Sequence, residues 1–332
     1  MRKFLQKVGL RLAILAGIWV IFTQVIPKRL YLGPEYSRWE TVWAGIGKVK
    51  EAKAPVNLVI GDSRPEMGLA SKHLRAWNYG LGGTSPVEGY YMLQQLADVP
   101  IDTLYLSYSP YHFHFQDCFH NRSEYFGFIA PGYIAEVESL SLALNDTVFQ
   151  WNNWAWLDDL DHNFPLPWVQ RQFRYLPPMR GLDNWRWYFR DRPEMQQRMA
   201  DNQLSYLFPS SVCPGDTSVQ EYFLEQQAGG FVLNPVNEFY FRKLLAEVTR
   251  REIHLVWINM PLNRAVRQPS AKYYADFERW LLAELPTGTP YIPLAYRDSC
   301  DFKDFSHLDA LAAEAYAKEL TQRLASQENP LP

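Results

Sequence analysis

The segment Pro55-Val-Asn-Leu-Val-Ile-Gly-Asp-Ser-Arg-Pro65 decides the predicted fold of this chain. Residues 55–60 form a short run that is rich in β-branched and apolar side chains, which predicts a buried strand. Pro65 suits the first turn of a helix, so we expect the strand and the helix to meet at Ser63. A serine on such a turn presents its hydroxyl group at the C-terminal edge of the sheet.

The alternation of strand and helix continues along the chain. Strands are predicted around residues 76–78 and 101–108, and the capping-box sequence Ser85-Pro86-Val87-Glu88 begins the helix between them. After residue 234 the pattern resumes, with helices at 235–250, 270–285 and 308–325 and strands at 253–259 and 291–294. This pattern predicts a three-layer α/β/α fold with a central parallel sheet and helices on both faces.

One large domain is predicted at residues 55–325, with an insertion at about residues 109–230 and a frayed polar tail at residues 326–332. We expect the aromatic side chains of the insertion to stack on sugar rings, to form core, or to contact lipid head groups. Its arginines would meet an anionic polymer or remain as solvated surface charges. These residues are Trp151, Trp154, Trp156, Trp168, Trp185, Trp187, Tyr175, Tyr188, Arg171, Arg174, Arg180 and Arg186.

The N-terminal segment predicts a membrane anchor. Four basic residues fall within the first eleven, and an apolar run follows at residues 12–26. Because no small-x-small cleavage site follows, we interpret residues 1–29 as an uncleaved signal anchor, a single transmembrane helix. The excess of positive charge before the run predicts a cytoplasmic N-terminus and a periplasmic or other extracytoplasmic domain, with residues 30–54 as a juxtamembrane connector. The alternative is a buried N-terminal helix of a soluble protein.

The composition argues against several classes of partner. The formal net charge of −3 and the lack of a dense Lys/Arg stripe argue against nucleic acid. Neither the three cysteines nor His112, His114, His120 and His162 have the spacing or neighbours of a metal site, so no metal or other cofactor is expected. Three cysteines, Cys118, Cys213 and Cys300, allow at most one internal disulfide, and the sequence leaves the pair open.

Ser63 is the candidate nucleophile. Its own N–H would lie at a helix N-terminus, where unpaired amides and the helix dipole favour the oxyanion of a tetrahedral intermediate. The structural alternative is that Ser63-Arg64-Pro65-Glu66 forms a capping box and that Ser63 merely caps the helix. Arg64 beside the nucleophile and Asn78 at the end of the second strand are candidate substrate-binding residues.

Two further segments favour catalysis. The turn Asn78-Tyr79-Gly80-Leu81-Gly82-Gly83 lies at the same sheet edge, and the Gly80 N–H there would be a second oxyanion donor. A tight turn alone would also explain these glycines. In Asp304-Phe305-Ser306-His307, His307 would take the serine proton and Asp304 would orient the imidazole. An isolated Asp-x-x-His is more often a helix N-cap with a neighbouring histidine.

These motifs in this order resemble the SGNH (GDSL-like) hydrolase superfamily over residues 55–108 and 235–325. The resemblance implies a catalytic triad of Ser63, His307 and Asp304, with an oxyanion hole at Ser63 and Gly80. The third motif of the family, Gly-x-Asn after the third strand, is missing from residues 106–111. Either Ser107 or Ser109 would donate instead, or the hole would have only two backbone donors. Deleting such a donor typically costs on the order of 10²–10³ in rate, which favours acyl transfer over efficient hydrolysis.

An anchor followed by such a domain is similar to the membrane-anchored envelope O-acylation proteins, the alginate acetylation protein J/X and teichoic-acid D-alanylation protein D families. That resemblance implies an O-acyltransferase, with acetyl as the expected group, that modifies a cell-envelope or secreted polysaccharide. It also implies a membrane-bound O-acyltransferase partner in the inner membrane. Two alternatives remain: a periplasmic carbohydrate esterase with the same triad, and a non-catalytic glycan-binding scaffold of a secretion or acylation complex.

Overall fold

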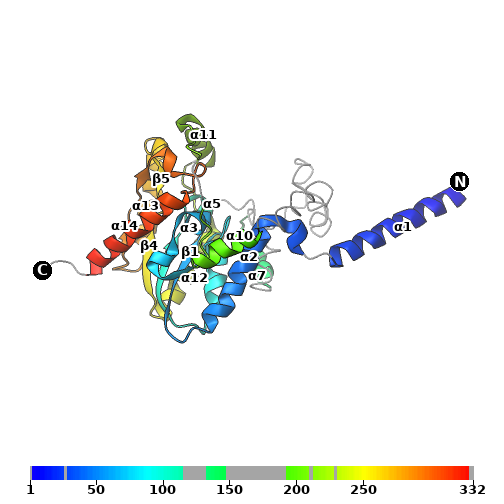
Figure 1. Ribbon diagram of the computed structural model, residues 1–332, viewed down its shortest axis with the longest axis horizontal. Helices are drawn as coiled ribbons and strands as arrows, with labels where there is room; N and C mark the ends of the chain where they lie inside the picture. The colour runs from blue at the N-terminus through cyan, green and yellow to red at the C-terminus, as the bar shows by residue number, and fades with distance from the viewer. Residues whose placement is uncertain are drawn as a thin grey trace. The chain divides into compact units, whose positions relative to one another are not determined.

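The computed structural model describes residues 2–25, 28–114, 132–146, 192–208, 212–227 and 230–328 (Figure 1). The chain divides into two compact units. One unit comprises residues 1–38 and 152–194, and the other comprises residues 39–151 and 195–332. The predicted aromatic cluster of the insertion, from Trp151 to Tyr188, and its four arginines lie outside the described residues, as does Cys118.

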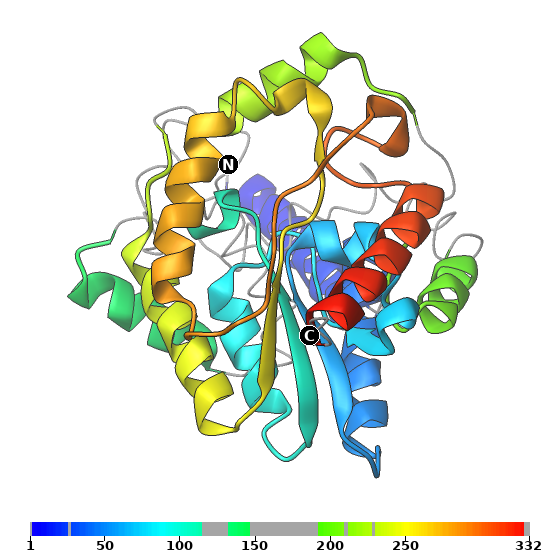
Figure 2. The same ribbon diagram turned by 90° about the vertical axis from the view of Figure 1, so that its left-hand side faces the viewer.

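The second unit contains a five-stranded parallel sheet in the order β2-β1-β3-β4-β6, which confirms the predicted α/β class and its central parallel sheet (Figure 2). Its strands are β1 (Val56–Gly61), β2 (Ala76–Asn78), β3 (Ile101–Ser107), β4 (His254–Ile258) and β6 (Tyr291–Ile292). The last four residues of β1 are buried, as expected for a strand covered on both faces. In register, Gly61 pairs with Ser107, so the ends of β1 and β3 lie side by side.

Helices connect the strands, and a last helix follows the final strand. They are α3 (Ser63–Gly68), α4 (Pro86–Gln95), α5 (Tyr111–His114), α7 (Tyr133–Ala143), α10 (Arg192–Asp201), α11 (Asp216–Gln226), α12 (Pro235–Arg250), α13 (Ala271–Glu284) and α14 (Ala310–Glu328), with short 3₁₀ turns η1 (Ser71–Leu74), η4 (Arg264–Val266) and η5 (Ser299–Asp301). The predicted capping box at Ser85 and Glu88 is present at the start of α4. A small second sheet, which the sequence did not predict, pairs β5 (Leu262–Asn263) with β7 (Tyr296–Arg297).

Each face of the sheet packs against different helices. On one face, Val59, Tyr105 and Val256 join a core with Ala313 and Leu320 of α14. On the other face, the fully buried Trp257 contacts the rings of Phe241 in α12 and Phe277 in α13. Alternate residues of each strand therefore face opposite helical layers, as the period of a strand requires.

Helices α1 (Arg2–Val25) and α2 (Lys28–Lys50) occupy most of the region predicted as anchor and connector. The described side chains of α1 are those of residues 6–18, and all of them are exposed. Among the residues that the structure describes, no helix is long and apolar enough to cross a membrane.

Replacing Trp257 with alanine should destabilise the second unit by about 3–5 kcal/mol, because a fully buried indole between two rings leaves a large cavity. Urea unfolding followed by circular dichroism measures the loss. Leu311→Ala is the control, since Leu311 is 78% exposed on α14 and should change stability by less than about 0.5 kcal/mol. Equal effects of the two substitutions would contradict the packing described for β4.

Candidate active site

Ser63 is the first residue of α3, and one residue, Asp62, separates it from the end of β1. The N-cap of α3 is Asp62, whose Oδ1 accepts a hydrogen bond from the Arg64 N–H at 2.8 Å. Ser63 therefore does not cap this helix, and the capping-box alternative from the sequence is wrong in that respect. An aspartate is among the preferred N-cap residues because its short carboxylate reaches the first free amides. The Ser63 hydroxyl is thereby left for another partner.

The partner of Ser63 is the predicted histidine. The Oγ of Ser63 lies 2.8 Å from Nε2 of His307, although 244 positions separate the two residues. On the other side of the ring, Nδ1 of His307 lies 2.9 Å from each carboxylate oxygen of Asp304. The carboxylate fixes the proton on Nδ1, so Nε2 carries the lone pair that can accept the serine proton. The structure thus brings all three predicted catalytic residues into one hydrogen-bonded chain.

Asp304 is held as an anion. Partial burial acts to raise its pKa, but the hydrogen bonds and charge of His307, together with the backbone N–H groups of Ser306 and His307, outweigh burial and lower the pKa to about 2. Both backbone bonds measure 2.9 Å. An ionised Asp304 stabilises the imidazolium that forms when His307 takes a proton. It does not cap α14, because Asp309 provides that cap through the Ala312 N–H at 2.8 Å.

The loop that carries Asp304 and His307 is held by a part of the insertion that the sequence did not connect with the site. A disulfide joins Cys213 to Cys300, and this settles the pairing that the sequence left open. Cys300 lies four positions before Asp304. Phe305 packs against Tyr222 of α11 with ring centroids 5.1 Å apart. The Lys303 N–H also donates to the His307 carbonyl at 2.9 Å. These contacts restrict the loop and therefore the position of the base.

Asn78 and Gly80 lie at the same sheet edge but serve the turn. The buried amide of Asn78 donates to the Pro65 carbonyl at 2.8 Å and to Ser205 Oγ at 3.0 Å, and its Oδ1 accepts the Gly80 N–H at 2.9 Å. A Cβ on Gly80 would meet the backbone of α3, with Glu66 N at 3.0 Å. Asn78, a candidate for substrate binding, is thus fully engaged inside the protein, and the Gly80 N–H already has an acceptor.

Oxyanion donors are therefore sparse in this structure. In the part of the chain that the structure describes, the N–H of Ser63 has no acceptor, which leaves it for an incoming oxyanion. The Gly82 N–H donates to Glu66 Oε2 at 2.7 Å, and the Ser109 N–H donates to Asp62 Oδ2 at 2.7 Å. Of the predicted oxyanion hole, Ser63 alone presents an unengaged amide among the described residues.

Ser107 and Ser109 lie beside the site, as predicted, and both are buried. Together with Arg64 and Tyr274 they border a small cavity of about 10 Å³, which is about the space one water needs. Arg64 is 8% exposed, and its Nη1 donates to the Tyr274 hydroxyl at 3.2 Å while the guanidinium lies 5.6 Å from the Phe223 ring centroid. Burial acts to lower the pKa of Arg64, but Tyr274 and Asp62 raise it above its ordinary value, so the side chain stays cationic.

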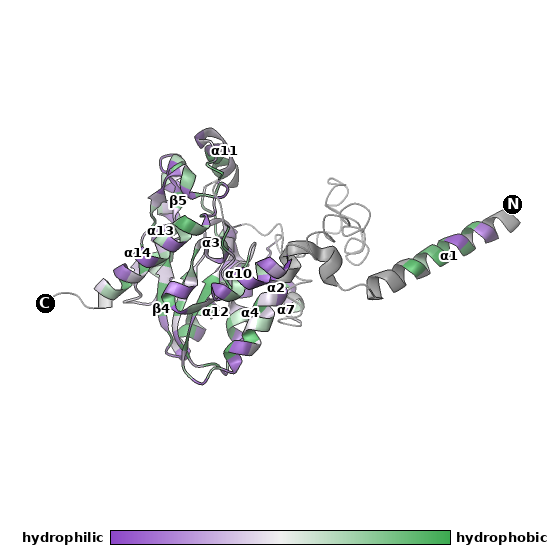
Figure 3. Ribbon diagram, viewed as in Figure 1, coloured by the Kyte–Doolittle hydropathy of each residue, from purple (hydrophilic) through white to green (hydrophobic). Residues whose placement is uncertain are grey.

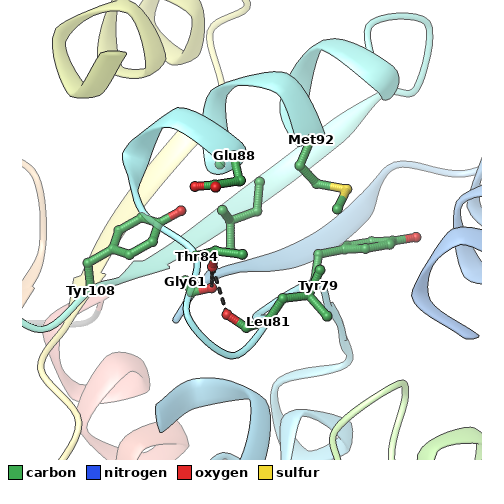
Figure 4. A pocket seen from close by; sticks show the side chains of 9 residues that line it. Gly61, Tyr79, Leu81, Thr84, Glu88, Met92 and Tyr108 are labelled. Carbon is green, nitrogen blue, oxygen red and sulfur yellow. Dashed lines mark hydrogen bonds between the residues drawn. The ribbon is translucent and has the colours of Figure 1, made fainter. Parts of the chain in front are cut away.

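A second small cavity lies at the end of β1 (Figure 4). Its volume is also about 10 Å³. Thr84 lines it, and the Thr84 hydroxyl is within hydrogen-bond distance of the carbonyls of Gly61, at 2.8 Å, and Leu81, at 2.7 Å. The buried Glu88 nearby already accepts from the Ser85 N–H and hydroxyl, both at 2.8 Å. The lining groups therefore serve the turn between β2 and α4.

The sequence missed three contributors to the site. Asp62 carried a signal, because an aspartate directly before a helix favours an N-cap. No sequence pattern indicated Phe223 and Tyr274, because their positions beside Arg64 depend on how α11 and α13 pack.

A comparison of the chain with models of known protein families and with curated protein sequences finds no match. The class of protein is consequently argued from the fold and from the geometry of the site.

Replacing Asp304 with asparagine should slow the reaction of Ser63 with a fluorophosphonate probe by on the order of 10²–10⁴-fold, because an amide no longer fixes the Nδ1 proton or stabilises the imidazolium. Gel-based labelling over time measures the rate. Asp301→Asn is the matched control, since Asp301 lies on the same loop and contacts Arg297 at 3.9 Å, away from His307. Equal labelling of wild type and Asp304→Asn would contradict the assigned role.

The same variant tests the ionisation of Asp304. Its folded pKa of about 2 lies below the ordinary 3.8, so its contribution to stability is fully present above pH 3.8 and is lost as pH falls through 2. The difference in free energy of unfolding between wild type and Asp304→Asn should therefore shrink across that window. Urea titrations at a series of pH values measure it, and a constant difference would show that the carboxylate has no depressed pKa.

Proposed function

We propose that this chain is a serine-dependent O-acyltransferase of the SGNH type that modifies a cell-envelope or secreted polysaccharide, with acetyl as the expected group. The observation that carries the proposal is the contact of Ser63 Oγ with His307 Nε2 at 2.8 Å, with Asp304 behind the ring. A hydroxyl group becomes an effective nucleophile only when a base accepts its proton, and this chain of groups supplies such a base.

The reaction proceeds in two steps. Ser63 Oγ attacks the carbonyl carbon of an acyl donor and passes its proton to His307 Nε2, and the oxyanion forms beside the Ser63 N–H. The leaving oxygen departs with the proton from His307, which leaves an ester on Ser63. An acceptor hydroxyl then gives its proton to His307 and attacks this ester, and Ser63 recovers a proton as the acylated glycan is released. Asp304 stays ionised throughout.

Transfer is favoured over hydrolysis by the donors around Ser63. The family asparagine is missing from the end of β3, and the Gly80 and Ser109 amides are engaged in internal hydrogen bonds. A weak oxyanion hole lowers the rate of both steps. A sugar hydroxyl that is bound beside the ester recovers part of this rate through proximity, whereas free water does not, so transfer is faster than hydrolysis. A carbohydrate esterase with the same three residues is the alternative, and a non-catalytic scaffold would not need the triad.

A membrane anchor at the N-terminus is part of the proposal. The described part of α1 carries exposed apolar side chains on successive turns, among them Leu10, Leu12, Ile14, Leu15 and Ile18 (Figure 3). Apolar residues around a helix behind a basic start are typical of a signal anchor. An extracytoplasmic domain also suits the disulfide between Cys213 and Cys300. A membrane-bound O-acyltransferase in the inner membrane would supply the acyl groups to Ser63.

The proposed activity predicts that Ser63→Ala abolishes transfer. Full-length protein in detergent, given 4-nitrophenyl acetate and a mixture of soluble envelope oligosaccharides, should release nitrophenol and acetylate a sugar, and mass spectrometry detects the product. The variant should lose both readouts because no acyl-enzyme can form. Ser139→Ala is the control, since Ser139 is exposed and its hydroxyl donates to the Ala135 carbonyl within α7.

Other outcomes would replace the proposal. Release of acetate without acetylated sugar, still dependent on Ser63, would identify an esterase. Full transfer by Ser63→Ala would remove the nucleophile from the mechanism.

A further inference from the structure

A larger cavity lies at the C-terminal edge of the sheet, between the end of β4, helix α13 and the strands β6 and β7. Its volume is about 350 Å³, within the range of sites for small ligands. Its walls include Asn259, Tyr274, Glu278, Tyr291 and Tyr296. Ligands of parallel α/β sheets bind outside the carboxyl ends of the strands, which is where this cavity lies.

Tyr274 links the cavity to the residue next to the nucleophile. The small cavity beside Ser107 and Ser109 and this larger one share Asn259, Tyr274 and Leu294 in their walls. The hydroxyl of Tyr274 accepts the hydrogen bond from Arg64, the residue that follows Ser63. A group bound in the larger cavity can thus contact Tyr274, the direct hydrogen-bond partner of Arg64.

The lining combines flat aromatic faces with polar groups. The Arg267 guanidinium lies 5.6 Å from the Tyr296 ring centroid, and among the described residues it has no carboxylate within 4 Å. The Tyr291 hydroxyl donates to Glu278 Oε1 at 2.7 Å, which leaves further acceptor capacity on that carboxylate. Rings can cover the C–H face of a sugar, while the carboxylate, hydroxyls and guanidinium can bond its hydroxyl groups.

An acyl chain fits this lining poorly. Burying methylene groups against the Glu278 carboxylate and the Arg267 guanidinium would desolvate both charges without a replacement hydrogen bond. A sugar residue replaces those lost water contacts with its own hydroxyl groups. We propose that this cavity binds one sugar residue of the acceptor glycan and so presents the next residue to the ester on Ser63. This inference rests on the proposed function for the role of the bound sugar.

Ala275→Trp tests the cavity. Ala275 is exposed on α13 and lines the cavity, so an indole there should fill the space without disturbing the core. Leu282→Trp is the matched control, because Leu282 lies on the same helix, is 51% exposed and is not part of the lining. Thermal unfolding of the three full-length proteins establishes that each is folded.

Binding is measured by saturation-transfer NMR with a panel of methyl glycosides of hexoses, N-acetylhexosamines and hexuronic acids, and with octanoate as an acyl-chain probe. At least one glycoside should bind wild type and Leu282→Trp, and its affinity for Ala275→Trp should fall by about tenfold or more. The inference is overturned if no glycoside binds wild type, if binding survives in Ala275→Trp, or if octanoate alone depends on Ala275.

The two proposals can fail separately. Fluorophosphonate labelling of Ser63 in the same wild-type preparation reports on the nucleophile and does not require a sugar. Sugar binding without labelling would remove the proposed reaction and leave the binding site. Labelling without sugar binding would overturn the cavity assignment and leave the acyl-enzyme.

Discussion

The buried carboxylate of Asp62 joins the turn that carries Ser63 to the segment after β3. One oxygen caps α3 through the Arg64 N–H, and the other accepts the Ser109 N–H from the segment after β3. A fully buried carboxylate is costly unless it is hydrogen-bonded, so these two amides and His112 Nε2 at 3.6 Å are what allow it to remain there. By taking the cap position, Asp62 places Ser63 at the first helical residue with its hydroxyl unengaged by the turn.

Close approach of the backbone is the second constraint at this edge. A Cβ on Gly61 would meet the Ser107 carbonyl oxygen at 2.0 Å, so β1 and β3 can approach one another only with glycine at this position. That approach brings the Asp62 carboxylate within reach of the Ser109 amide. The glycine and the aspartate of the Gly-Asp-Ser sequence are thus both explained by geometry before any chemistry is considered.

Local patterns were sufficient to predict the sheet and the triad. The apolar run of β1, the capping box of α4 and the order of strands and helices depend on near neighbours, and each is found where the sequence placed it. The pair Asp304 and His307 was predicted from its combination with the Gly-Asp-Ser and Asn78–Gly83 segments, because its spacing alone is more typical of a helix N-cap. The fold brings His307 to Ser63 across 244 positions. The alternative in which Ser63 caps the helix was wrong, because either of two adjacent residues can cap a helix and only the backbone geometry selects one. The Gly80 N–H, expected as an oxyanion donor, donates to Asn78 Oδ1 instead.

The rest of the site depends on tertiary packing, which no local pattern encodes. Phe223 and Tyr222 come from α11, inside the segment that lacked strand–helix alternation, yet they contact Arg64 and Phe305. The disulfide between Cys213 and Cys300 joins the same segment to the loop of the base. The C-terminal part of the insertion therefore contributes side chains that contact residues of the site. The motifs at residues 55–108 and 235–325 therefore predicted that Ser63, His307 and Asp304 lie together, but not which side chains surround them. Under the proposed function, the groups that select the acceptor would come from these surroundings, because a catalytic triad contacts only the acyl carbon and the transferred proton.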